Sequence, residues 1–257
     1  ILLPVSLQAQ NFFMVDQPLT VVVLLSAWVW LRFSSHPSYA LGLLYGTLTA
    51  AAILVKGNGW FLVLFPMFHI LFAQRWGLLR DPRLYTGAML CLLAVVPWYM
   101  VTTKISADGF NYSFGIDYAS KALTQNLLTL YHNVGAVGLA LALFAITRLW
   151  SAGDGRTDLV RISVSMIAAV LLLHSLIPVD IVNRYMMPAM PFLLLLAILG
   201  IVEMANLAYL EMRTGILHVA QAVALLMLLL PGLINLSSAY PQRDLRMAEA
   251  SEMIVDS

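Results

Sequence analysis

A series of long apolar runs, separated by short charged segments, constrains this chain more than any other feature. Only 14 basic and 13 acidic residues occur among 257, whereas about a quarter of a typical soluble domain is charged. The runs are continuous and show no alternation with period two, which argues against a β-barrel. Because roughly 20 apolar residues cross a bilayer as a helix, the sequence predicts an all-α, polytopic transmembrane bundle of about eight spans.

The spans are joined by short loops, with one longer outer loop at 102–125. They are predicted at 17–33, 39–55, 59–73, 84–101, 126–148, 161–178, 188–206 and 215–237. Residues 1–240 are expected to form the membrane domain, and 241–257 to begin a soluble extracytoplasmic tail. The chain opens inside apolar sequence without a basic segment or a cleavage site, so no signal peptide is predicted. We expect it to be part of a longer protein.

Loop charges predict the orientation of the bundle. If the 74–83 loop with its three arginines is cytoplasmic, alternation puts eight basic residues on that side and six on the other. This bias follows the positive-inside rule. Asp16, Lys56 and Arg184 then share the outer side. Ionisable residues near membrane depth are candidates for function, so the three together suggest a site that handles anions.

Asp16 begins a long apolar run in Met14-Val15-Asp16-Gln17-Pro18-Leu19-Thr20. In one interpretation it is an N-cap that accepts hydrogen bonds from first-turn amides, where Pro18 is tolerated. In the other it is a functional carboxylate that orients an acceptor or binds a cation. The two interpretations are compatible.

Lys56 and Arg184 each allow a structural and a functional interpretation. Lys56, in the tight reversal Lys56-Gly57-Asn58-Gly59, is either a snorkelling lysine or a cation beside a phosphate, assisted by amides of the next helix. Arg184 is either an interfacial anchor or a bidentate phosphate ligand. Its neighbour Tyr185 is placed to hydrogen-bond the same group.

Three further residues are candidate substrate contacts: His132 near the end of a span, Lys104 in the expected outer loop, and Tyr99. His69 and His174 lie within spans and are expected to be satisfied bundle histidines. No histidine pair has the i, i+4 spacing of a zinc site, so no metal ligands are predicted, and a divalent cation is left open as a cofactor. No basic cluster is dense enough for nucleic acid to be a partner.

Four motifs occur in the order seen in a known family. They are Met14-Val15-Asp16-Gln17-Pro18-Leu19-Thr20, Leu54-Val55-Lys56-Gly57, Pro97-Trp98-Tyr99 and Arg184-Tyr185-Met186-Met187-Pro188-Ala189-Met190-Pro191. From about residue 5 to 200, the chain resembles polyprenyl-phosphate-sugar-dependent glycosyltransferases of the GT-C superfamily, in the branch of the aminoarabinose lipid A transferase and the protein O-mannosyltransferases. Asn58 departs from the commoner pattern, in which proline follows Lys-Gly.

The resemblance implies transfer of a sugar from a polyprenyl-phosphate donor to a lipid, glycan or protein acceptor. The reaction is expected at the extracytoplasmic face, in a bacterial inner membrane. The resemblance implies that Asp16 is a supporting acid, and that Lys56 and Arg184, with Tyr185, lie near the donor phosphate. The family's principal acid lies in the first outer loop, so it is expected upstream of this chain, and this segment alone is expected to be inactive.

Two other functions remain open. A transporter or flippase for an anionic lipid or solute would carry charges deep within its spans. An envelope polymer enzyme of the O-antigen polymerase or ligase type would carry essential basic residues in large outer loops.

Overall fold

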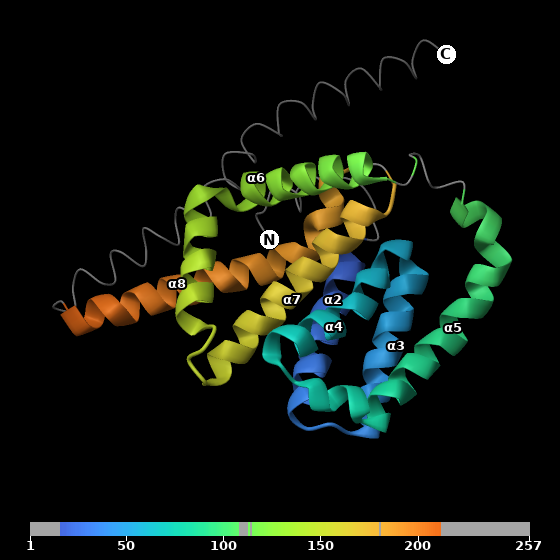
Figure 1. Cartoon of the computed structure of the whole chain (residues 1–257), viewed down its shortest axis with the longest axis horizontal. Helices are drawn as coiled ribbons and strands as arrows, with labels where there is room; N and C mark the ends of the chain where they lie inside the picture. The colour runs from blue at the N-terminus through green and yellow to red at the C-terminus, as the bar shows by residue number, and fades with distance from the viewer. Residues whose placement is uncertain (1–15, 108–112, 114, 180, 212–257) are drawn as a thin grey trace, which may run out of the picture.

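The computed structural model of the protein describes residues 16–107, 113, 115–179 and 181–211 (Figure 1). Within them the chain forms helices and no strand, which confirms the predicted all-α membrane bundle. The α-helices are α2 (Asp16–Ser35), α3 (Tyr39–Val55), α4 (Phe61–Ala73), α5 (Pro82–Ala107), α6 (Ile116–Leu149), α7 (Gly155–Leu176) and α8 (Met190–Glu211). Three 3-10 helices precede α4, α5 and α8: η1 (Gly57–Trp60), η2 (Trp76–Arg80) and η3 (Asn183–Ala189).

Five of these helices are long and apolar enough to cross a bilayer, namely α2, α5, α6, α7, and α8 together with η3. The apolar helices α3 and α4 are shorter, and α3 matches the predicted span 39–55. The predicted span 215–237 and the predicted tail 241–257 lie outside the described residues.

The predicted outer loop at 102–125 is wrong for most of its length. Helix α5 continues to Ala107, and α6 already begins at Ile116. The charged residues of this segment suggested a loop, but Tyr118, Ala122 and Asn126 are buried at helical spacing. A single helix with one buried face therefore replaces the second half of the expected loop.

The predicted span 126–148 is also divided. Gly135 interrupts α6 with φ 75° and ψ 170°, a conformation that glycine adopts without the steric cost met by other residues. Figure 1 shows the consequence: the first part of α6 crosses the top of the bundle, then bends sharply, and the second part runs downward.

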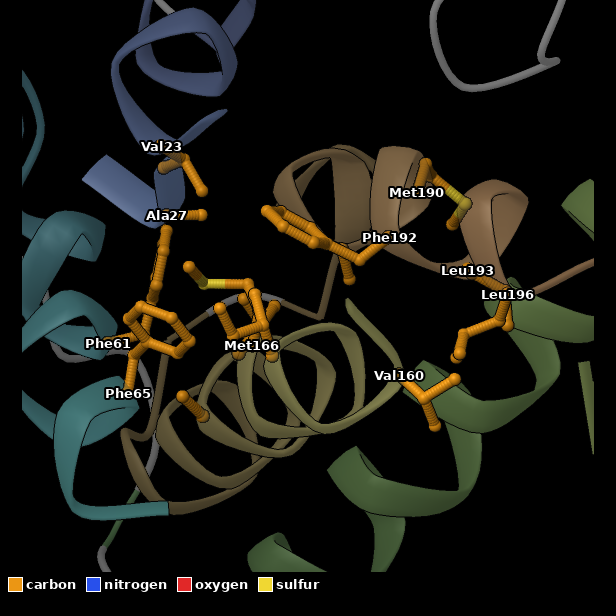
Figure 2. Packing of buried hydrophobic residues seen from close by; sticks show 14 of the residues in the cluster. Val23, Ala27, Phe61, Phe65, Val160, Met166, Met190, Phe192, Leu193 and Leu196 are labelled. Carbon is orange, nitrogen blue, oxygen red and sulfur yellow. The ribbon is translucent and has the colours of Figure 1, made fainter. Parts of the chain in front are cut away.

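Helices α2, α4, α7 and α8 share one apolar core. Figure 2 shows their side chains converging, among them Ala27, Phe61 and Met166. Within this core the Trp30 Nε1–H donates a hydrogen bond to His69 Nδ1 at 3.0 Å. His69 therefore has a partner within the bundle, as its position in a span predicts.

Helix α5 packs on α3 through glycines. A Cβ built on Gly46 of α3 would overlap the carbonyl oxygen of Gly87 in α5, and one built on Gly87 would overlap the carbonyl oxygen of Gly42. Small residues at helical spacing let two membrane helices approach at backbone distance. This contact holds α5, which is otherwise little buried, against the bundle.

We expect Gly46→Ala to destabilise the protein, because the added methyl group would meet backbone that cannot rotate away. Overpacking of this kind costs about 1–3 kcal/mol, which would be measured as a lower thermal unfolding midpoint in detergent. Gly77→Ala is the matched control, since a Cβ at Gly77 meets nothing within 4 Å. Equal midpoints for the two variants would contradict close α3–α5 packing.

One end of the bundle is held by ion pairs of arginine and is called the arginine end below. After α4, Arg75 donates to both carboxylate oxygens of Asp158 at 3.0 Å and to the Ser34 carbonyl at 2.7 Å. Arg156 pairs with Glu203 of α8 at 3.0 Å. Two helix connections are thereby tied to the core helices.

Candidate functional site

An ion pair joins the start of α2 to the end of α3, at the end of the bundle opposite the arginine end. Lys56 caps α3 in an extended conformation, and its Nζ donates to Oδ1 of Asp16. The Asp16 side chain is 3% exposed and the Lys56 side chain 17%. The sequence places the two residues in these positions because each stands where an apolar helix begins or ends. The pair satisfies both charges in a largely buried position.

Tyr185 of η3 lies beside this pair and beside a second cation. The Lys56 Nζ is 5.0 Å from the centroid of the Tyr185 ring, and the Arg184 Cζ is 5.8 Å from it. Both distances lie in the range of cation–π attraction. Asp16, Lys56, Arg184 and Tyr185 are called the outer cluster below, after the side on which the loop charges predict them. Among these four residues there are two cations and one carboxylate, and the carboxylate pairs with Lys56.

His174, in the last turn of α7, supports the Tyr185 ring from another side. The two rings are 5.3 Å apart at 33°, and Phe61 of α4 is 6.2 Å from the His174 ring on the core side. His174 Nδ1 lies 2.8 Å from the Val170 carbonyl. The Nε2 atom is buried and has no hydrogen-bond partner among the described residues.

Trp60 and Tyr99 adjoin Lys56. The Trp60 Nε1–H donates to the Tyr99 hydroxyl at 3.1 Å, and the two rings meet edge to face. A Cβ on Gly57 would lie 3.2 Å from the same hydroxyl. Tyr99 of α5 is thus held against the reversal that carries Lys56.

The segment before α8 is fastened to the first part of α6. The Thr129 hydroxyl donates to Oδ1 of Asn183, and the Tyr118 hydroxyl donates to the Val179 carbonyl, at 2.9 and 2.8 Å. Asn183 immediately precedes Arg184. Helix α6 therefore helps to set the position of the outer cluster.

The structure brings four of the predicted site residues together: Asp16, Lys56, Arg184 and Tyr185. Tyr99 is adjacent through Gly57. His132 is exposed on α6, where its ring packs on the neighbouring Tyr131, and no contact among the described residues joins it to the cluster. The side chain of Lys104 lies outside the described part of the chain. The chemical roles of these residues stay predictions.

Sequence reasoning missed His174 and Trp60 as neighbours of the site. Both are common residue types for a membrane bundle, and each lies far along the chain from at least one of its partners. The only signal in the sequence is that each stands near the outer end of a span, as Lys56 and Tyr185 do. That signal does not distinguish a site residue from an interfacial one.

No group of three or more His, Cys, Asp or Glu residues within the described ranges is arranged to hold a metal ion. Within the outer cluster, the Asp16 carboxylate is paired with Lys56. Its chemistry fits recognition of an anion by nitrogen donors.

Comparison with known proteins gives one family. The model described as dolichyl-phosphate-mannose-protein mannosyltransferase matches residues 2–100. The match includes Asp16, Lys56 and Tyr99, and it ends before Arg184. Neither a curated protein nor a solved structure was found to match the chain. The family match supports a membrane glycosyltransferase related to the GT-C superfamily.

Proposed function

We propose that this chain carries the donor-phosphate site of a glycosyltransferase that uses a polyprenyl-phosphate sugar at the extracytoplasmic face. The outer cluster supports this proposal, because it places two cations, Lys56 after α3 and Arg184 in η3, beside one aromatic ring, that of Tyr185. The membrane is proposed to be a bacterial inner membrane, with the arginine end in the cytoplasm as the positive-inside rule favours.

In this proposal Lys56 and Arg184 bind the donor phosphate. When the bond between the sugar and the phosphate breaks, negative charge grows on the departing phosphate oxygen. Cations that are already in place stabilise such charge without reorganising, and their effect is larger where water is partly excluded. Arg184 offers a planar fork of donors, and Lys56 offers a point charge.

Asp16 is proposed to act as a supporting acid in two ways. Its carboxylate holds the Lys56 ammonium beside Tyr185. It also stands at the start of α2, where a carboxylate can orient the incoming acceptor or accept its proton. The acceptor is proposed to be a hydroxyl or a phosphate on a lipid, glycan or protein.

A transport function receives less support. In the described helices, charged residues concentrate in the first or last turns or in pairs such as Arg156 with Glu203. A conduction path for an anion would require charged groups along the middle of the spans.

Binding of a polyprenyl phosphate to the full-length protein in nanodiscs tests the proposal. We expect Arg184→Gln to weaken this binding roughly tenfold or more, because a hydrogen bond to a charged group contributes about 1.5–3 kcal/mol. Lys121→Gln is the matched control, since Lys121 is an exposed cation on the first part of α6. If the wild-type protein bound polyprenyl phosphate no better than the uncharged polyprenol, the donor-phosphate assignment would be wrong.

A further inference from the structure

The first part of α6, residues 116–134, differs in direction from the second part. It crosses the bundle at the end that carries the outer cluster, and it bends at Gly135 into the second part (Figure 1). A helix that lies across the ends of transmembrane helices runs near the plane where hydrocarbon meets water.

One face of this helix is already covered by the bundle. Tyr118, Ala122, Asn126, Leu130 and Asn133 are buried, at spacings of three and four residues. The hydrogen bonds from Tyr118 and Thr129 described above fasten this face to the segment before α8. The helix is thus held in a fixed rotation about its own axis.

Its exposed surface divides into two flanks of different chemistry. At 100° per residue, Ile116, Leu123, Leu127 and Tyr131 align on one flank, and their exposed fractions are 88%, 42%, 48% and 45%. Ser120 is the polar member of this apolar flank. The other flank carries one exposed leucine, Leu128. Its remaining exposed residues are polar: Asp117, Lys121, Thr124, Gln125 and His132.

The length of the second part limits how far the first part can stand from the hydrocarbon. Residues 136–149 measure about 21 Å at 1.5 Å per residue, whereas the hydrocarbon core is about 30 Å thick. The second part ends at Arg148 and the α6–α7 connection, which carries charged residues. If that connection stays in the headgroup region of one leaflet, the first part must lie at or below the headgroups of the other.

We infer that residues 116–134 form an interfacial helix whose apolar flank is inserted into the outer leaflet. The apolar flank faces lipid acyl chains, the polar flank faces water and headgroups, and the third face packs on the bundle. Such helices insert their apolar side by about 5–10 Å. Tyr131 on the apolar flank suits the boundary, where its hydroxyl reaches headgroups. The same helix carries Thr129, so the membrane surface and the outer cluster are attached to one rigid element.

Site-directed spin labelling of the full-length protein tests this arrangement without any substrate. Single cysteines are introduced by Leu123→Cys and Leu127→Cys on the apolar flank, and by Lys121→Cys and Gln125→Cys on the polar flank. The background carries Cys91→Ala and no other reactive cysteine. Each nitroxide is measured in phosphatidylethanolamine–phosphatidylglycerol vesicles for collision with oxygen, which concentrates in lipid, and with a water-soluble nickel chelate.

On the apolar flank we expect oxygen to be the more effective relaxant, with loss of nickel accessibility. On the polar flank we expect the reverse. The difference between oxygen and nickel accessibility should therefore change sign from one labelled position to the next along the helix. High nickel accessibility at both apolar positions would show that this flank faces water and would overturn the inference. Low accessibility to both reagents there would show that a protein surface covers the flank, which would overturn it equally.

Discussion

Under the proposed function, Asp16→Asn in the full-length protein is expected to lower sugar transfer from a polyprenyl-phosphate donor on the order of a hundredfold, the lower range for loss of a group in general acid–base catalysis. Asparagine keeps the size of the side chain and the preference for a helix start. Its amide oxygen can still accept a hydrogen bond from Lys56. The expected drop in sugar transfer would therefore be due to the missing negative charge alone. Initial rates with a radiolabelled donor, together with thermal unfolding, measure the effect.

Asp158→Asn is the matched control for Asp16→Asn. Asp158 also pairs with a cation, Arg75, but at the arginine end, so its loss should reduce stability and leave turnover per folded molecule unchanged. The double variant Asp16→Asn with Lys56→Gln removes both charges of the outer pair. It should recover stability relative to Asp16→Asn alone and remain inactive. Unchanged turnover in Asp16→Asn would leave Asp16 with a structural role only, as the partner of Lys56.

The helical bundle and the grouping of charged residues could be predicted from the sequence, because both depend on the positions of apolar runs. Successive spans cross the membrane in opposite directions. This alternation alone puts the start of α2, the end of α3 and the start of α8 at the same end of the bundle. That argument predicted a common side for Asp16, Lys56 and Arg184. It could not predict that Lys56 contacts Asp16 and the Tyr185 ring, since contacts depend on how the helices pack.

The course of the chain between α5 and α7 could not be predicted in the same way. Hydropathy does not distinguish a polar loop from a helix that is buried on one face and exposed on two flanks. The segment 116–134 has such a pattern, and its buried Asn126 and Asn133 lower its apparent hydrophobicity further. The bend at Gly135 is set by a backbone conformation, which a single glycine in a sequence does not announce.

His174 shows the same limit at the site. A lone histidine within an apolar span is usually a satisfied core residue. His69 accepts a hydrogen bond from Trp30 at Nδ1, although its Nε2, like that of His174, is buried without a partner among the described residues. His174 differs only because η3 folds back and places Tyr185 on its ring. The connection between α7 and α8 produces this contact, and no spacing within either helix indicates it.

We therefore expect His174 to position Tyr185, and we expect His174→Ala to impair both stability and donor use. Removing a large buried ring leaves a cavity, and comparable truncations cost about 3–5 kcal/mol. Phe61 and Tyr185 would then each lose their contact with the His174 ring. Tyr185 would move relative to Lys56 and Arg184, so KM for the polyprenyl-phosphate sugar should rise more than kcat falls.

His174→Phe separates this positioning role from a chemical one. Phenylalanine keeps an aromatic ring that can contact both Phe61 and Tyr185 but has neither ring nitrogen, so both the unfolding midpoint and KM should return close to the wild-type values. The ring stack, rather than Nε2, would then be what the site requires. If His174→Phe had a normal unfolding midpoint and still lost turnover as His174→Ala does, the buried nitrogen would have to contact the substrate, and the positioning role would be wrong.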